Sequence, residues 1–294
     1  MTKLQSSKDI YTRFNREGYI LIKNVFPKEE IRAKREEIIK KANNENDILS
    51  IPGLNKFVLN SKIIFHLKSI LNSKKLFYFG DSSIVNHDNI YETKRGFHTD
   101  ARDDFGDPKR TIYPIIRMGV YFQDCKDFSG GLKIRQGSHK HFCFMTADKK
   151  EIRTSIKELS QFFKGESRFT LSSFKLGKSI NVPIEEGDVA IWNMRTHHSG
   201  MSYRLKSMPN VSLYPQIEQF LPKNLFIEPQ YGRNRVAIFS AFSSGDESNP
   251  YVKNYISLKY NRKQVAQIIE NSIVSKKLNR IGIKVVDDKI KYFN

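Results

Sequence analysis

The chain has 294 residues, of which 39% are apolar and 12% are aromatic, enough to bury a substantial hydrophobic core. It carries 50 lysine and arginine residues against 31 aspartate and glutamate residues, so the net charge is +19 and an anionic partner is favoured. No apolar run has the length of a membrane span, and Met1 to Ser7 contain no apolar signal segment. We therefore expect a soluble, cytoplasmic protein.

The distribution of charge and the cysteines narrow the class of partner. Lysines are spread along the whole chain without a basic stripe of interleaved aromatic residues, so an anionic small molecule is expected rather than nucleic acid. The two cysteines, Cys125 and Cys143, have neither the spacing of a metal site nor the number that a disulfide framework needs. Both are expected to be free thiols.

The first 75 residues are predicted to form a helical N-terminal preamble. Residues 9–15, 29–42 and 62–71 have helical patterns, and the second of these carries isoleucines on one side with Lys and Glu elsewhere. Residues 18–26 are rich in β-branched and aromatic side chains, which predicts a first strand within this preamble.

Residues 76–245 carry short apolar segments separated by turn signals, which predict a β-rich core. The expected strands lie at 76–79, 82–86, 115–123, within 130–139, and at 179–183, 188–192 and 235–242. Two polar segments, 146–174 and 201–230, are expected to be insertions in this core, the second of a size typical of a lid or a substrate-binding loop.

Residues 246–294 are predicted to form a helical C-terminal tail. An amphipathic helix is expected at 262–277, and 281–293 is expected to be either a strand or a docking segment. We therefore predict one domain over 1–294, mainly β with flanking helices, in which the strands form a barrel or a sandwich.

A histidine and an aspartate two residues apart stand in the stretch Gly96–Asp100. On a strand, His98 and Asp100 would point to the same face, where an imidazole nitrogen and a carboxylate oxygen can bind one metal ion. A second histidine would complete the two-histidine, one-carboxylate set of non-haem Fe(II) oxygenases. His197 and His198 both follow the strand predicted at 188–192, and only one of them can point to the metal on a regular strand.

An Fe(II) oxygenase needs a source of electrons, and a bound 2-oxo acid is a common one. Its far carboxylate requires an arginine, whose planar fork binds a carboxylate through two hydrogen bonds. Arg235 begins the apolar strand predicted at 235–242, where it can serve this purpose or face solvent. Arg117 lies inside another apolar strand, where it either faces solvent or pairs with an anion in the barrel.

Six sequence motifs resemble those of the phytanoyl-CoA dioxygenase family and occur in that family's order. They are Gly-Tyr-Ile-Leu-Ile-Lys-Asn-Val (18–25), Phe-His-Thr-Asp (97–100), Gly-Gly-Leu-Lys-Ile-Arg-Gln-Gly-Ser-His-Lys (130–140), Gly-Asp-Val-Ala-Ile-Trp (187–192), His-Ser-Gly (198–200) and Arg-Val-Ala-Ile-Phe (235–239). The resemblance covers residues 9–245 and implies a double-stranded β-helix core of the jelly-roll, cupin-like type. It also implies Fe(II) as cofactor, with 2-oxoglutarate and O2 as co-substrates.

The resemblance implies a role for individual residues. His98 and Asp100 match the family's His-x-Asp ligands, and His198 matches the distal ligand, although a family variant with one more residue before Ser-Gly would place it at His197. Arg235 matches the anchor of 2-oxoglutarate.

Three further residues are candidates for this site. Arg204 is the alternative anchor, because it lies nearer the family's usual interval from the distal histidine. Asn86 stands where family members contact the C1 end of 2-oxoglutarate, and we expect Arg117 to contact the substrate.

The resemblance implies an oxidoreductase that releases succinate and CO2, and with the net charge of +19 we expect it to hydroxylate a C–H bond of a small, anionic metabolite. The carboxylate at Asp100 leaves no ligand position for chloride, so hydroxylation is favoured over halogenation. Two alternatives stay open: a 2-oxoglutarate oxygenase that acts on nucleic acid, and a jelly roll that binds metal without catalysis.

Overall fold

The computed structural model describes residues 6–41, 47–87, 96–101, 113–140, 178–218, 220–231, 235–245, 248–259 and 262–286. Cys143 and the insertion expected at 146–174 lie outside these residues. The helices of the described residues are α1 (Ser7–Glu17), α2 (Lys28–Lys41), α3 (Ser61–Leu71), α5 (Pro215–Glu218), α6 (Pro250–Lys259), α7 (Arg262–Glu270) and α8 (Ser272–Arg280). The strands are β1 (Tyr19–Ile22), β2 (Leu76–Tyr78), β3 (Ser82–His87), β4 (Ile115–Tyr121), β5 (Gly131–Arg135), β6 (Ser179–Asn181), β7 (Val189–Asn193), β8 (His198–Ser202), β9 (Arg235–Ser243) and β10 (Ile283–Val285).

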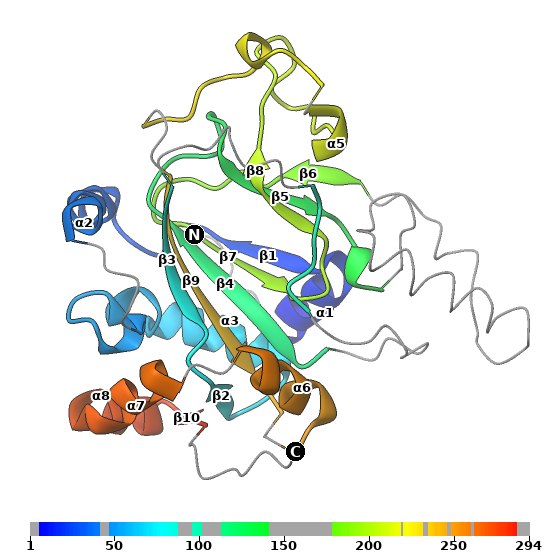
Figure 1. Ribbon diagram of the computed structural model, residues 1–294. Coiled ribbons are helices and arrows are strands. Elements are labelled where there is room, and N and C mark those ends of the chain that lie inside the picture. The colour runs from blue at the N-terminus through cyan, green and yellow to red at the C-terminus, as the bar shows by residue number, and fades with distance from the viewer. Residues whose placement is uncertain are drawn as a thin grey trace, which may run out of the picture.

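These strands form two sheets (Figure 1). The larger has seven strands in the order β1-β7-β4-β9-β2-β10, and β3 also pairs with β9. All its pairs are antiparallel except β10 with β2. The smaller sheet has the order β6-β5-β8 and is antiparallel throughout. The predicted combination of β-sheets with flanking helices is therefore confirmed.

The larger sheet has two different faces because side chains alternate along each strand. On β9, Val236 and Ile238 pack into a core shared with the helices, whereas Ala237 packs into a core shared with the smaller sheet. On β7, Ile191 belongs to the first core and Trp192 to the second. We call the face of the larger sheet that is turned toward the smaller sheet the inner face.

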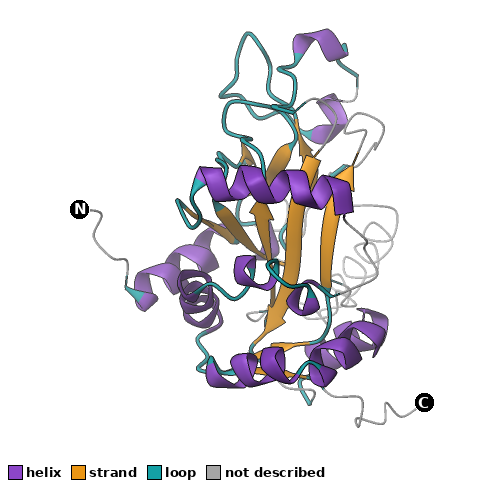
Figure 2. Cartoon of the chain, turned by 90° about the vertical axis from the view of Figure 1, so that its left-hand side faces the viewer, coloured by secondary structure: helices purple, strands orange, loops and turns teal. Residues whose placement is uncertain are grey.

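Helices cover the opposite face (Figure 2). Isoleucine, leucine and phenylalanine side chains of α1, α2, α3, α7 and α8 form one continuous core with this face of the larger sheet. Helix α6 packs elsewhere: its Val252, Tyr255 and Ile256 share a third core with Ile115 and Ala241 of β4 and β9. Helix α6 therefore closes one end of the inner face.

The expected insertion at 201–230 begins inside a strand. Met201 and Ser202 belong to β8, so the excursion proper starts at residue 203. Its helix α5 is held to the smaller sheet by a buried ion pair between Glu218 and Lys133 of β5. Lys133 also donates to the carbonyl oxygen of Leu213 at 2.8 Å, so the excursion is fixed to the side of β5 that faces away from the larger sheet.

The C-terminal tail differs from the expectation in two ways. The helix expected at 262–277 is two helices, because the side chain of Asn271 accepts a hydrogen bond from the backbone N–H of Val274 and starts a new helix there. Beyond them, the tail returns to the larger sheet as β10, parallel to β2. Within the described residues, no helix has the length and apolar character needed to span a membrane.

Substitution Ile191→Ala tests the core between the helices and the larger sheet. Ile191 is fully buried, so we expect the free energy of unfolding to fall by about 2–5 kcal/mol. The control Ile273→Ala removes a side chain that is 78% exposed on α8 and is expected to change it by about 0.5 kcal/mol or less. Urea denaturation of both variants measures the difference, and equal losses would contradict this assignment of the core.

Candidate metal centre

The segment 96–101 joins the two sheets by its backbone. His98 pairs with His198, the first residue of β8: His98 N–H donates to the carbonyl oxygen of His198 at 3.0 Å, and His198 N–H donates back at 2.9 Å. Two residues later, Asp100 N–H donates at 2.9 Å to the carbonyl oxygen of Met194, which follows β7 of the larger sheet. Only His98 forms a bridge in this segment, so the continuous strand expected there is not present.

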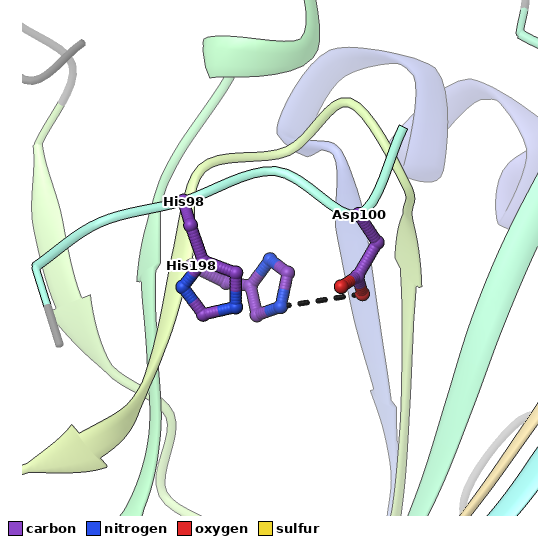
Figure 3. Close-up of side chains that lie close together, drawn as sticks. All are labelled: His98, Asp100 and His198. Atoms are coloured by element: carbon purple, nitrogen blue, oxygen red, sulfur yellow. Dashed lines mark ion pairs between the residues drawn. The ribbon is translucent and has the colours of Figure 1, made fainter. Parts of the chain in front are cut away.

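This arrangement brings three side chains together (Figure 3). His98, Asp100 and His198 each offer one ligand atom, and these atoms all lie within 4.8 Å of one another. The Nε2 atom of His198 lies 3.3 Å from Oδ2 of Asp100, and the two imidazole ring centres are 4.3 Å apart. The cluster is only partly covered, since His198 is buried and the other two are half-buried.

The hydrogen bonds of His198 determine which ring nitrogen faces the cluster. Its Nδ1 lies 3.0 Å from the carbonyl oxygen of Thr196, so Nδ1 bears the proton and donates it. Burial lowers the pKa of His198 to about 4, an effect larger than the increase caused by the Asp100 carboxylate. At neutral pH, a lone pair on Nε2 and a carboxylate oxygen therefore face each other, and a cation between them would satisfy both.

His197, the alternative third ligand, lies on the other side of the smaller sheet. Its Nδ1 is 3.1 Å from Nη1 of Arg135, and its backbone N–H donates to the hydroxyl of Ser138 at 2.8 Å. The cluster of potential ligands includes His198 and not His197. His197 immediately precedes β8, whose first residue is His198, and its contacts with Arg135 and Ser138 separate the two rings.

Arg235 lies on the inner face with its guanidinium turned toward β8. The side chain is 6% exposed, and Nη1 donates to the carbonyl oxygen of Gly200 at 2.6 Å. Gly200 permits this approach, since a Cβ there would lie 2.6 Å from Nη1. Gly200 is two residues beyond His198 on β8, which is about 7 Å along a strand.

No carboxylate forms an ion pair with Arg235 within the described part of the chain. Its Nε is buried without a hydrogen-bond partner, and so is Nε1 of Trp192, whose ring lies 5.4 Å from that of His198. Buried donors without partners are rare in folded proteins. The buried guanidinium and the indole N–H can both donate hydrogen bonds to a polar, anionic ligand on the inner face.

Arg204, the alternative anchor, is used differently. Its Nε donates to the carbonyl oxygen of Cys125 at 3.0 Å, and its Nη1 donates to that of Pro209 at 3.1 Å. These bonds hold the start of the excursion against the loop after β4. Burial lowers the pKa of Arg204, an effect larger than the increases caused by Cys125, Asp127 and Asp124.

Arg117 is paired with two carboxylates. Its Nη1 lies 3.4 Å from Oδ2 of Asp100, and its Nη2 lies 2.7 Å from Oδ2 of Asp81 and 3.2 Å from the hydroxyl of Tyr255. Burial lowers the pKa of Arg117, but Asp100 and Asp81 outweigh this effect, so the pKa is raised. Both terminal nitrogens of Arg117 therefore contact protein groups. The expected contact between Arg117 and a substrate stays a prediction.

The remaining predicted site residue is Asn86. It lies on β3, where the register places it opposite Val236 of β9. Its side chain lies outside the described part of the structure, so the predicted contact with 2-oxoglutarate is untested.

Sequence reasoning did not find Asp81, Tyr255 or the role of Trp192. Asp81 is 36 residues from Arg117 in sequence, and Tyr255 is 138 residues from it. No local pattern marks such contacts, because only the pairing of β4 with β9 and the packing of α6 bring these side chains together.

Comparison with solved structures supports the fold. SnoK, a non-heme alpha-ketoglutarate-dependent carbocyclase from nogalamycin biosynthesis, is similar with a TM-score of 0.50 and 16% identity, over 83% of this chain and 85% of that one. EctD from S. alaskensis, solved with 2-oxoglutarate and 5-hydroxyectoine, has a TM-score of 0.48 and 12% identity, over 83% and 78% of the two chains.

HygX from Streptomyces hygroscopicus, solved with nickel and 2-oxoglutarate, has a TM-score of 0.48 and 15% identity, over 82% of this chain and 87% of that one. No family model matches the sequence, and no curated protein matches it. The similarity to SnoK over most of both chains shows that the two proteins share a similar fold.

The pKa of His198 can be measured directly in the metal-free protein. We expect a neutral ring at pH 5.5 with its proton on Nδ1, because burial lowers the pKa to about 4. The unfolded ring binds its proton near pH 6.5, as is usual for histidine, so the folded protein loses stability as the pH falls from about 6.5 to about 4. Nitrogen-15 NMR of the imidazole reports both charge and tautomer, and a titration near pH 6.5 would contradict the burial described here.

Proposed function

We propose that the protein is an Fe(II)- and 2-oxoglutarate-dependent dioxygenase that hydroxylates a C–H bond of a small metabolite. The observation that carries this proposal is the meeting of His98, Asp100 and His198, with the guanidinium of Arg235 bonded two residues further along β8. Two histidines and one carboxylate are the donor set of non-haem Fe(II) oxygenases. The resemblance to the phytanoyl-CoA dioxygenase family and a jelly-roll arrangement of the strands belong to this proposal.

The donor atoms suit Fe(II) in chemistry and number. Two imidazole nitrogens and one carboxylate oxygen neutralise one of the two positive charges and leave coordination positions for a co-substrate and O2. When bound, the metal and 2-oxoglutarate together supply the oxidation: one oxygen atom of O2 enters the substrate as a hydroxyl group, and the other enters succinate as CO2 leaves.

Arg235 and its surroundings suit the far carboxylate of 2-oxoglutarate. The guanidinium is buried and, among the residues that the structure describes, forms no ion pair with a carboxylate, so an incoming carboxylate can neutralise it through charge-assisted hydrogen bonds. A five-carbon diacid reaches from this guanidinium to the neighbourhood of His198. The solved structures of EctD and HygX contain 2-oxoglutarate, which agrees with this proposal for the present chain.

Aromatic side chains of the inner face limit the access of water to this region. The ring of Trp192 lies 5.4 Å from that of His198 and 5.9 Å from that of Phe239, and the ring of Tyr121 lies 5.7 Å from the guanidinium carbon of Arg235. Exclusion of water strengthens the attraction between guanidinium and carboxylate. It also protects a reactive site from side reactions.

The two adjacent histidines give a matched test of the metal ligands. We expect His198→Ala to weaken Fe(II) binding by more than about 100-fold and to abolish succinate formation, because a ligand is lost. We expect His197→Ala to bind Fe(II) like the wild type, because that ring contacts Arg135 instead. Anaerobic calorimetry with Fe(II) and a succinate assay measure both effects, and the reverse result would assign the third ligand to His197.

The two buried arginines give a matched test of the co-substrate anchor. We expect Arg235→Gln to weaken 2-oxoglutarate binding by about 10- to 100-fold, the value of one or more hydrogen bonds to a charged group. We expect Arg204→Gln to leave this affinity close to that of the wild type, because Arg204 is bonded to the carbonyl oxygens of Cys125 and Pro209 and not to β8 beside His198. Calorimetry with 2-oxoglutarate on the metal-loaded protein decides between them, and a larger loss for Arg204→Gln would overturn the choice of anchor.

A further inference from the structure

We propose that Arg117, held by Asp81 and Tyr255, is a positioning residue that orients the Asp100 carboxylate toward the two histidines. This inference rests on the proposed function, because it concerns the metal ligand Asp100. It assigns roles to a buried network that connects the metal centre to helix α6.

The contacts form a chain from α6 to the metal centre. The hydroxyl of Tyr255 donates to Oδ2 of Asp81, the same oxygen that lies 2.7 Å from Nη2 of Arg117. The other terminal nitrogen of Arg117 then lies 3.4 Å from Oδ2 of Asp100. The guanidinium therefore bridges the two carboxylates, and Tyr255 fixes the one that is further from the cluster.

Each member except Asp100 stands on a rigid part of the fold. Arg117 lies on the central strand β4, paired with Trp192 on one side and Ala241 on the other. The carbonyl oxygen of Asp81 accepts a hydrogen bond of 3.0 Å from the backbone N–H of Ala241. The ring of Tyr255 packs on that of Phe79 at 5.3 Å.

Asp100, in contrast, stands on a segment with a single bridge, at His98. Its backbone is held by Met194, but a carboxylate can still rotate about its side-chain bonds. Arg117 restricts this rotation, because its Nη1 attracts Oδ2 of Asp100. The same oxygen lies 3.3 Å from Nε2 of His198. The carboxylate is thereby presented to the ligand cluster before a metal binds.

The balance of charge supports positioning rather than binding of a substrate anion. Arg117 faces two carboxylates, so its positive charge is already compensated. Its side chain is also largely covered, with 16% of its surface exposed. Arg235, on the same sheet face, has no such partner in the described residues. Outer groups that hold a metal ligand typically change metal affinity by 10- to 100-fold when they are removed.

Two tyrosines provide a matched test. Tyr255 and Tyr78 each donate a buried hydroxyl to an aspartate, Asp81 and Asp47 respectively, but Tyr78 packs in the core that the larger sheet shares with the helices, and Asp47 accepts hydrogen bonds from Leu49 and Ser82 and not from Arg117. We expect Tyr255→Phe to weaken anaerobic Fe(II) binding by about 10-fold and to alter the visible absorption of bound Co(II). We expect Tyr78→Phe to reduce thermal stability and to leave both metal readouts unchanged.

Arg117 and Asp81 supply independent variants. We expect Arg117→Gln to weaken Fe(II) binding by about 100-fold and Arg117→Lys to restore part of this loss, because lysine keeps the charge without the fork. Asp81→Asn keeps the shape and removes the charge, and it is expected to resemble Tyr255→Phe. This variant also preserves the test if Tyr255→Phe does not fold.

The outcomes separate this inference from the proposed function. Wild-type affinity and wild-type Co(II) spectra in folded Tyr255→Phe, Asp81→Asn and Arg117→Gln would overturn the positioning role and leave the metal centre intact. Equal losses of affinity in Tyr255→Phe and Tyr78→Phe would also overturn it, since they would reflect stability alone. Failure of the wild-type protein to bind Fe(II) or Co(II) would overturn the proposed function and this inference together.

Discussion

The candidate site depends on the backbone hydrogen bonds of one short segment. His98 is bonded to β8 of the smaller sheet, and Asp100 is bonded to Met194 at the end of β7 in the larger sheet. Because the two sheets share a packed core, these bonds fix the distance between the two side chains and His198. The arrangement places three potential metal ligands together in a partly covered site, where one cation can contact all of them.

Two arginines on the same face of the larger sheet differ in whether a carboxylate neutralises their charge. Arg117 is neutralised by Asp81 and Asp100, whereas Arg235 is buried with a carbonyl oxygen as its hydrogen-bond partner. A buried charge without a counterion is costly, so a fold retains it where an anion binds. These contacts are the basis of our proposals that Arg235 binds the co-substrate and that Arg117 orients Asp100.

The sequence predicts much of the fold because short runs of β-branched and other apolar residues mark most strands, as in 115–123 and 235–242, which are buried on both faces of the sheet. It does not predict β8, because His-Ser-Gly-Met-Ser has neither β-branched residues nor apolar alternation, and its pairing with β5 depends on distant residues. The same strand explains why His198, which we expected at the exit of the preceding strand, instead begins a strand of the other sheet. The sequence pattern selected His98 and Asp100 and left His197 and His198 open, the family resemblance favoured His198, and the structure brings His198 to the other two. The network of Asp81, Arg117 and Tyr255 has no local signal.

Anaerobic titration of the wild-type protein, first with Fe(II) and then with 2-oxoglutarate, tests the central claim most directly. We predict one ferrous ion per chain and, after addition of 2-oxoglutarate, a visible charge-transfer absorption that reports chelation of the metal by the keto acid. A protein that binds no ferrous ion, or a ferrous protein whose absorption does not change with 2-oxoglutarate, would contradict the account.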